Sequence, residues 1–112
     1  MDLKKIQAIR NSFEKERNWD KSLASNVFVH LIEELGEIGR YINFEEKYKD
    51  EKLGNSPNIN RRELKREFAQ AMMLFIQLAN HYEIDLDEAI EKESKLMEGR
   101  FKRVKFLKKV PT

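Results

Sequence analysis

The sequence contains no cysteine, which excludes disulfide bonds, zinc-thiolate sites and thiol nucleophiles. It has only four glycines and two prolines, so few positions favour a break in a helix. No apolar run approaches the roughly 20 residues that a membrane-spanning helix needs. Residues 1–10 also lack the apolar centre of a secretory signal peptide. We therefore expect a cytoplasmic protein that does not bind a membrane.

Charged residues make up 38% of the chain and apolar residues 40%, a balance typical of a folded, helix-rich protein. The 112 residues predict one domain, residues 1–112. A chain of this size builds only one modest hydrophobic core, so we expect it to associate into a homodimer or a homotetramer.

The net charge of +2 conceals an uneven distribution of 22 basic and 20 acidic residues. Six basic residues follow Glu98, the last acidic one, so residues 1–99 carry 22 − 6 = 16 basic and 20 acidic groups. The tail from about 100–112 is therefore basic, but apolar residues alternate with its charges at near-helical spacing. We expect its apolar side to pack on the body or on a second subunit. Nucleic-acid binding through these charges is a less favoured alternative.

Apolar periodicity predicts four helical segments and no strands, which indicates an all-α protein, a bundle of four to five helices. The first segment runs from about Leu3 to Arg17. The second begins near Asp20 or Ser22, either of which is a suitable N-cap, and extends to about residue 48. A loop rich in Gly, Asn and Pro follows, ending near residue 60. The third segment, capped by Asn60, runs to about His81, and Asp85 is expected to cap the fourth.

Glutamates interrupt the apolar stripes of the second and third segments. At about 100° per residue, Glu34 and Glu37 fall on the apolar side of the second helix, and Glu33 lies at its edge. Glu67 lies near the centre of the apolar face of the third helix. A buried, ionised carboxylate without a partner costs several kcal/mol, and converging carboxylates repel one another. The pattern therefore predicts a positive charge between the two helices.

A divalent cation satisfies this requirement better than a side chain does, because Arg40 and Arg66 fall off the apolar stripes. Oxygen ligands without cysteine favour Mg²⁺, with Mn²⁺ as an alternative. A carboxylate-bridged di-iron site is disfavoured, because it needs a Glu-x-x-His pair from each of two helices. Here His30 precedes Glu34 by four residues, and His81 follows Glu67 by fourteen.

These same residues carry a resemblance to a known family. EELGE (33–37) and EFAQ (67–70) are similar to the Glu-Glu-x-x-Glu and Glu-x-x-Asp motifs of the MazG-like nucleotide pyrophosphohydrolases, in the all-α NTP pyrophosphatase superfamily. The likeness spans roughly residues 13–101 and includes RNWD (17–20), LAN (78–80) and IDLDEAIEKESK (84–95).

The resemblance implies an enzyme that uses Mg²⁺ to hydrolyse nucleoside triphosphates to monophosphate and pyrophosphate. It implies metal ligands at Glu34, Glu37 and Glu67, with Gln70 at the fourth position, and a water-orienting role for Glu33. Basic residues that bind phosphates align loosely with Lys92, Lys95 and Arg100, for which a solvated helix face is the alternative. Trp19, the only tryptophan, has two interpretations: it stacks on the base or sugar, or it anchors the core.

The chain departs from the family pattern at position 70, where Gln70 replaces an aspartate. An amide oxygen still coordinates a cation, but the site loses one negative charge, and Glu63 lies one turn before Glu67, placed to compensate. The asparagine that often follows the lysine of the fourth helix is also missing, since Leu96 and Met97 follow Lys95. These differences raise a second hypothesis, a catalytically weakened or inactive helical oligomer that binds a nucleotide or a partner.

Overall fold

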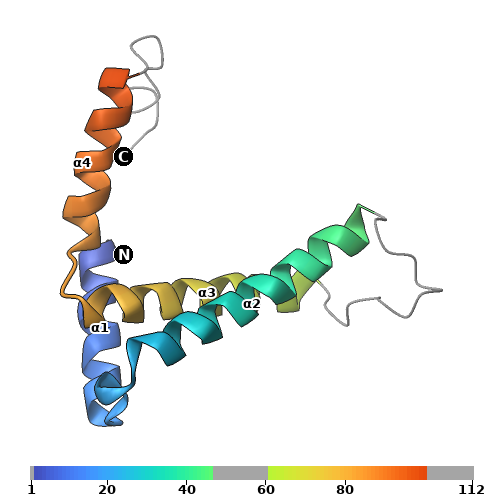
Figure 1. Ribbon diagram of the computed structural model, residues 1–112, viewed down its shortest axis with the longest axis horizontal. Helices are drawn as coiled ribbons and strands as arrows, with labels where there is room; N and C mark the ends of the chain where they lie inside the picture. Colours follow the sequence, from blue (N-terminus) through green and yellow to red (C-terminus); the bar gives the residue numbers. More distant parts are fainter. Residues whose placement is uncertain (1, 47–60, 101–112) are drawn as a thin grey trace.

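In the computed structural model, residues 2–46 and 61–100 are described, and all of their regular structure is helical (Figure 1). The predicted all-α class is confirmed. The predicted loop, its cap Asn60 and the basic tail beyond Arg100 lie outside the described residues. No helix in the two described ranges is long and apolar enough to cross a membrane. The elements are α1 (Leu3–Glu16), the short 3₁₀ turn η1 (Trp19–Lys21), α2 (Ala24–Glu45), α3 (Arg61–His81) and α4 (Leu86–Arg100).

The start of α1 is capped by Asp2, whose carboxylate accepts a hydrogen bond from the Lys5 amide at 2.7 Å. After α1 the chain turns at Asn18, which has a left-handed φ of 58°, a conformation that asparagine tolerates better than most residues. The 3₁₀ turn follows, and the Ser22 amide donates to its first carbonyl at 3.0 Å. Residues 20 and 22 therefore belong to this turn and its end.

The predicted capping of α2 by Asp20 or Ser22 is wrong. The N-cap is Leu23, which makes no side-chain hydrogen bond. By contrast, the prediction for α4 is confirmed, because the Asp85 carboxylate accepts from the Glu88 amide at 3.2 Å. The predicted bounds of α1 and the predicted end of α3 at His81 are close to those observed.

Helices α2 and α3 run side by side and form one arm of the molecule (Figure 1). Their facing stripes meet in a hydrophobic cluster, against which Tyr41 and Leu78 also pack. The 3.6-residue period assigned these positions to the apolar faces, but it also assigned Leu35, Phe68 and Phe75, which are 47–57% exposed. The buried members are Val27, Leu31, Ile38, Leu64, Ala71 and Leu74.

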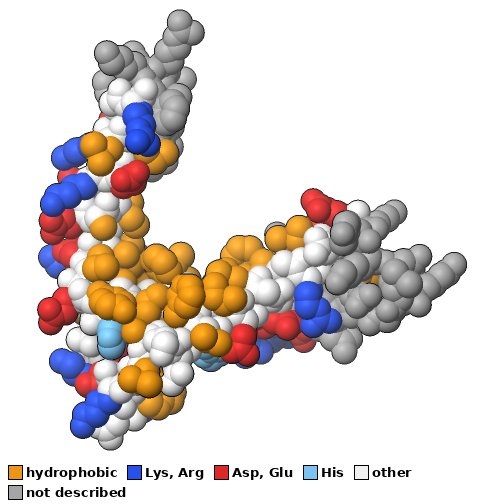
Figure 2. All heavy atoms as spheres, in the orientation of Figure 1, with side chains coloured by type: hydrophobic (Ala, Val, Ile, Leu, Met, Phe, Trp, Pro, Cys, Tyr) orange, Lys and Arg blue, Asp and Glu red, His pale blue; other side chains and the backbone are white. Residues whose placement is uncertain are grey.

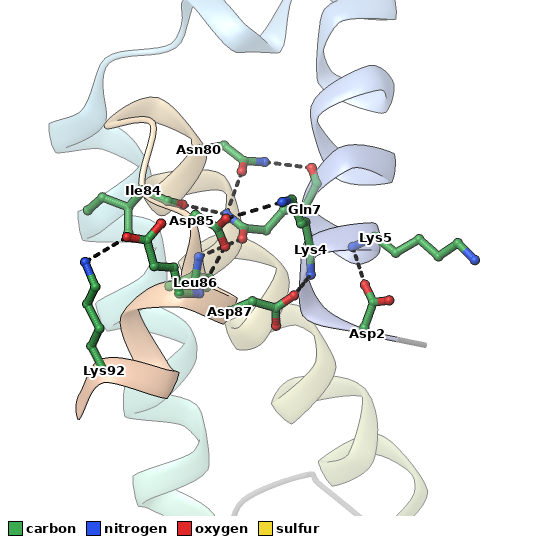
Figure 3. A network of polar contacts seen from close by, with 11 residues as sticks. Asp2, Lys4, Lys5, Gln7, Asn80, Ile84, Asp85, Leu86, Asp87 and Lys92 are labelled. Carbon is green, nitrogen blue, oxygen red and sulfur yellow. Dashed lines mark hydrogen bonds and ion pairs between the residues drawn. The ribbon is translucent and has the colours of Figure 1, made fainter. Parts of the chain in front are cut away.

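A second cluster joins α1, α3 and α4, with Ile76 only 1% exposed at its centre. Beside it, the Gln7 side chain ties α1 to the turn between α3 and α4 (Figure 3). Its Nε2 donates to Asn80 Oδ1 at 3.0 Å and to the Ile84 carbonyl at 2.8 Å, and its Oε1 accepts from the Leu86 amide at 2.9 Å. Asn80 Nδ2 donates back to the Gln7 carbonyl at 3.0 Å. This polar joint directs α4 away from the α2 and α3 arm.

The chain is consequently open and flat, with principal extents of 47 × 46 × 24 Å. An apolar groove of about 440 Å³ lies in the angle between the two arms, where hydrophobic side chains gather in Figure 2. We call this the inner groove. Its lining residues are Leu3, Leu31, Leu35, Ile38, Phe68, Ala71, Met72, Phe75, Leu86 and Ile90. Several of them are about half exposed, so the chain by itself leaves part of its apolar surface uncovered.

Candidate active site

The carboxyl groups of Glu34 and Glu67 meet across the interface between α2 and α3. The hydrogen bond that a protonated Glu67 shares with Glu34, together with burial and the charges of Glu34 and Glu37, raises the pKa of Glu67 to about 7. When both groups are ionised neither can donate, and the buried Oε2 of Glu67 then has no hydrogen-bond partner. Two carboxylates from different helices are therefore held against their mutual repulsion, as the sequence pattern predicted.

This pair makes stability depend on pH in a defined direction. Glu67 binds its proton more tightly in the folded chain (pKa about 7) than in the unfolded chain (4.5). The folded chain therefore loses stability as pH rises from about 4.5 to 7. We expect Glu67→Gln to be more stable than the wild type at pH 8 and close to it at pH 4.5, measured by urea denaturation with EDTA present.

Other acidic groups also titrate over this range, so the informative quantity is the difference between the variant and the wild type. Mg²⁺ added at pH 8 should stabilise the wild type and leave Glu67→Gln nearly unchanged, because ligands stabilise only the state that binds them. A stability difference of equal size at both pH values would show that the pair is not strained.

The other predicted acidic ligands take different positions. Glu37 is half-buried and close enough to raise the pKa of Glu67, but both of its oxygens lie 3.5 Å from Arg40 Nη1. Gln70 is exposed and lines a pocket with Glu34. Glu33 is exposed and makes no ion pair with another described residue. The structure thus brings Glu34 and Glu67 together, with Glu37 and Gln70 nearby and Glu33 apart.

Basic side chains only weakly balance the negative charge of Glu34 and Glu67. Arg66 lowers the pKa of Glu67, but less than the opposing causes raise it, and His30 Nε2 lies 3.4 Å from Glu34 Oε1. A buried carboxylate oxygen without a donor, beside a second carboxylate, suits a hard divalent cation. Within residues 2–46 and 61–100, however, no three His, Asp or Glu side chains are already arranged closely enough to hold a metal ion.

A pocket of about 300 Å³ adjoins this carboxylate pair; we call it the carboxylate pocket. It is lined by Arg10, His30, Glu34, Ala69, Gln70, Met73 and Leu74. Arg10 comes from α1 and was not predicted as a site residue. At about 100° per residue, Arg10 lies between Leu3 and Ile6 on α1, and its polar neighbours on that side, Gln7 and Glu14, are only 8% and 3% exposed. A polar stripe at positions 7, 10 and 14 was the available signal.

Trp19 lines a different pocket, of about 240 Å³, whose other walls are mostly polar. Its ring packs edge-on against Phe13 at 5.6 Å and is 45% exposed, so Trp19 is not a buried core anchor. Stacking on a base or sugar remains a prediction. Glu14 lines this pocket and pairs with Arg10, which lines the carboxylate pocket, so the ion pair lies between the two.

The basic residues predicted on α4 lie on the other arm (Figure 1). Lys92 pairs with Glu88 at 2.8 Å and Lys95 with Glu91 at 3.3 Å, each one turn along the same helix. Arg100, the last residue of α4, is exposed. None of the three lines the carboxylate pocket of its own chain.

Comparison of the chain with protein-family models, with curated proteins and with solved structures gave no match.

Proposed function

We propose that this protein is a Mg²⁺-dependent, MazG-like nucleoside triphosphate pyrophosphohydrolase of the cytoplasm. It would convert an NTP or dNTP and water to the nucleoside monophosphate and pyrophosphate. The observation that carries the proposal is the pair of carboxylates, Glu34 and Glu67, held together from two helices beside a pocket. The motif resemblance of residues 33–37 and 67–70 supplies the reaction class.

The chemistry of phosphoryl transfer fits such a site, because it depends mainly on positioning and on neutralising phosphate charge. Glu34 and Glu67 would hold the cation, with Glu37 and Gln70 as additional ligands and Mn²⁺ as a substitute ion. A bound divalent cation supplies charge neutralisation and a more acidic water molecule. The carboxylates themselves contribute the fixed geometry, since their helices are locked by the cluster around Leu31 and Leu74.

One assay tests the proposal directly. Pyrophosphate release is measured from all common NTPs and dNTPs, with Mg²⁺ and Mn²⁺ in parallel. Release from at least one nucleotide, abolished by EDTA, is the expected result. No release from any nucleotide with either metal would leave the second hypothesis, a nucleotide-binding or partner-binding oligomer, which Gln70 favours.

Replacing Gln70 with aspartate separates the two hypotheses. Gln70 lines the carboxylate pocket with Glu34, so the added charge strengthens the attraction for a divalent cation. We expect Gln70→Asp to bind Mg²⁺ about tenfold more tightly and to raise kcat/KM at limiting Mg²⁺. Metal affinity is measured by isothermal titration calorimetry, and turnover by pyrophosphate release.

Gln77 provides the matched control, because it lies on the same helix but contacts Arg10. Gln77→Asp adds the same charge seven residues further along α3 and should leave Mg²⁺ affinity within about twofold. If an inert wild type gains hydrolysis through Gln70→Asp, the weakened-enzyme hypothesis is favoured. If Gln70→Asp leaves metal affinity unchanged, position 70 is not a ligand.

The inner groove supports association with a second copy of the chain, as a homodimer or as a homotetramer of two dimers. Five of its side chains are 47–57% exposed: Leu35, Phe68, Met72, Phe75 and Ile90. Covering them would remove on the order of 450 Å² of apolar area per chain, worth about 11 kcal/mol.

A further inference from the structure

The carboxylate pocket needs a cation from the protein if it is to hold a phosphate chain, and α4 does not supply one within the same chain. Lys92 and Lys95 are about three-quarters exposed and paired with glutamates of their own helix. Among the described residues that line the carboxylate pocket, Arg10 is the only lysine or arginine. Its side chain is 14% exposed, so its guanidinium is largely removed from bulk water.

Two neighbours hold Arg10 in one orientation. Its Nε lies 2.6 Å from Glu14 Oε2, and its Nη2 donates to Gln77 Oε1 at 3.1 Å. Both partners are buried, Glu14 at 3% and Gln77 at 8% exposure. Because an arginine side chain loses much rotamer freedom on binding, a guanidinium already fixed in this way binds a ligand at lower entropic cost.

The guanidinium of Arg10 has N–H groups that Glu14 and Gln77 do not engage. Arginine has five N–H groups. Nε is in ion-pair contact with Glu14, and Nη2 donates one hydrogen bond to Gln77. Among the described residues, Nη1 makes no hydrogen bond. A planar fork with free N–H groups matches phosphate oxygens, to which arginine binds in a bidentate manner.

The position of Arg10 relative to the carboxylate pair fits an elongated anion. Glu67 and Gln77 are ten residues apart on α3, about 15 Å along the helix axis. Arg10 reaches back from Gln77 into the pocket that Glu34 also lines. A polyphosphate whose metal-bound end lies at Glu34 and Glu67 would therefore extend toward Arg10.

We propose that Arg10 is a substrate-binding residue that contacts the phosphate chain of the ligand, oriented by Glu14 and Gln77. This inference rests on the proposed function, because it takes the ligand to carry phosphates. It assigns the phosphate contact to α1 and not to α4 of the same chain.

The test measures binding of inorganic tripolyphosphate with Mg²⁺ by calorimetry, so that no turnover is needed. Changing Arg10 alone would leave Glu14 buried without its partner, so the variant is the double substitution Arg10→Gln with Glu14→Gln, which removes both charges. We expect it to bind tripolyphosphate at least tenfold more weakly, and to raise KM for the nucleotide more than it lowers kcat. Circular dichroism checks that the variant remains folded.

Lys5→Gln is the matched control, since it removes one positive charge from the same helix at an exposed position; it should bind within twofold of the wild type. Glu14→Gln alone keeps Arg10 but removes one of the two groups that orient it, so its affinity should lie between those of the wild type and the double variant. Wild-type affinity in the double variant would overturn the inference, as would a wild type that binds no tripolyphosphate. If Glu34→Gln abolishes hydrolysis but the double variant hydrolyses the nucleotide as the wild type does, only the proposed role of Arg10 is contradicted. If tripolyphosphate binds through Arg10 but no nucleotide is hydrolysed, only the hydrolase proposal is contradicted.

Discussion

Glu34→Gln is expected to lower pyrophosphate release by a hundredfold to a thousandfold, the scale seen when one electrostatic contact to a transition state is removed. Glu34 faces Glu67, contacts His30 at 3.4 Å and lines the carboxylate pocket. The substitution therefore removes the carboxylate that takes part in all three of these arrangements. The measurement is kcat/KM for the best nucleotide at saturating Mg²⁺.

The variant should remain folded, because an amide at position 34 relieves the repulsion with Glu67. Loss of activity with unchanged or higher thermal stability therefore points to chemistry and not to unfolding. Glu45→Gln is the control, since it removes the same charge from an exposed position on α2. Unchanged turnover in Glu34→Gln would mean that the carboxylate pair is not the active site.

Phe75→Glu is expected to convert an oligomer into a monomer. Phe75 lines the inner groove and is 48% exposed. A charge there would have to be buried without a partner on association, at a cost of several kcal/mol, which corresponds to a dissociation constant raised more than a hundredfold. Sedimentation equilibrium gives the mass of both proteins across a range of concentrations.

Phe28→Glu is the matched control: Phe28 is 51% exposed but does not line the inner groove. It should keep the mass of the wild type. A monomeric wild type, or dissociation caused by Phe28→Glu and not by Phe75→Glu, would contradict association through the inner groove.

The helices and the carboxylate pair were predictable because both follow from a single periodicity. Glu34 and Glu67 stand out where the apolar stripes of α2 and α3 require leucine, and burial of one stripe against the other brings them together. A local pattern therefore fixed a contact between residues far apart in the sequence.

Arg10 and the direction of α4 were not predictable in this way. Arg10 pairs with Glu14 and donates to Gln77, and hydropathy does not register polar residues that find partners inside the fold. The course of α4 depends on hydrogen bonds between Gln7 and a turn about 77 residues later, which no local signal reports. The cap at Leu23 was missed because η1 uses the residues that best suit an N-cap.

The carboxylate pocket and the inner groove are both formed by α2 and α3 but share no lining residue. A neighbouring subunit and a small anion would accordingly occupy different surfaces and would not compete for the same residues. Nucleotides could enter and leave while the assembly stays intact, and a compound that blocks one event would leave the other unobstructed.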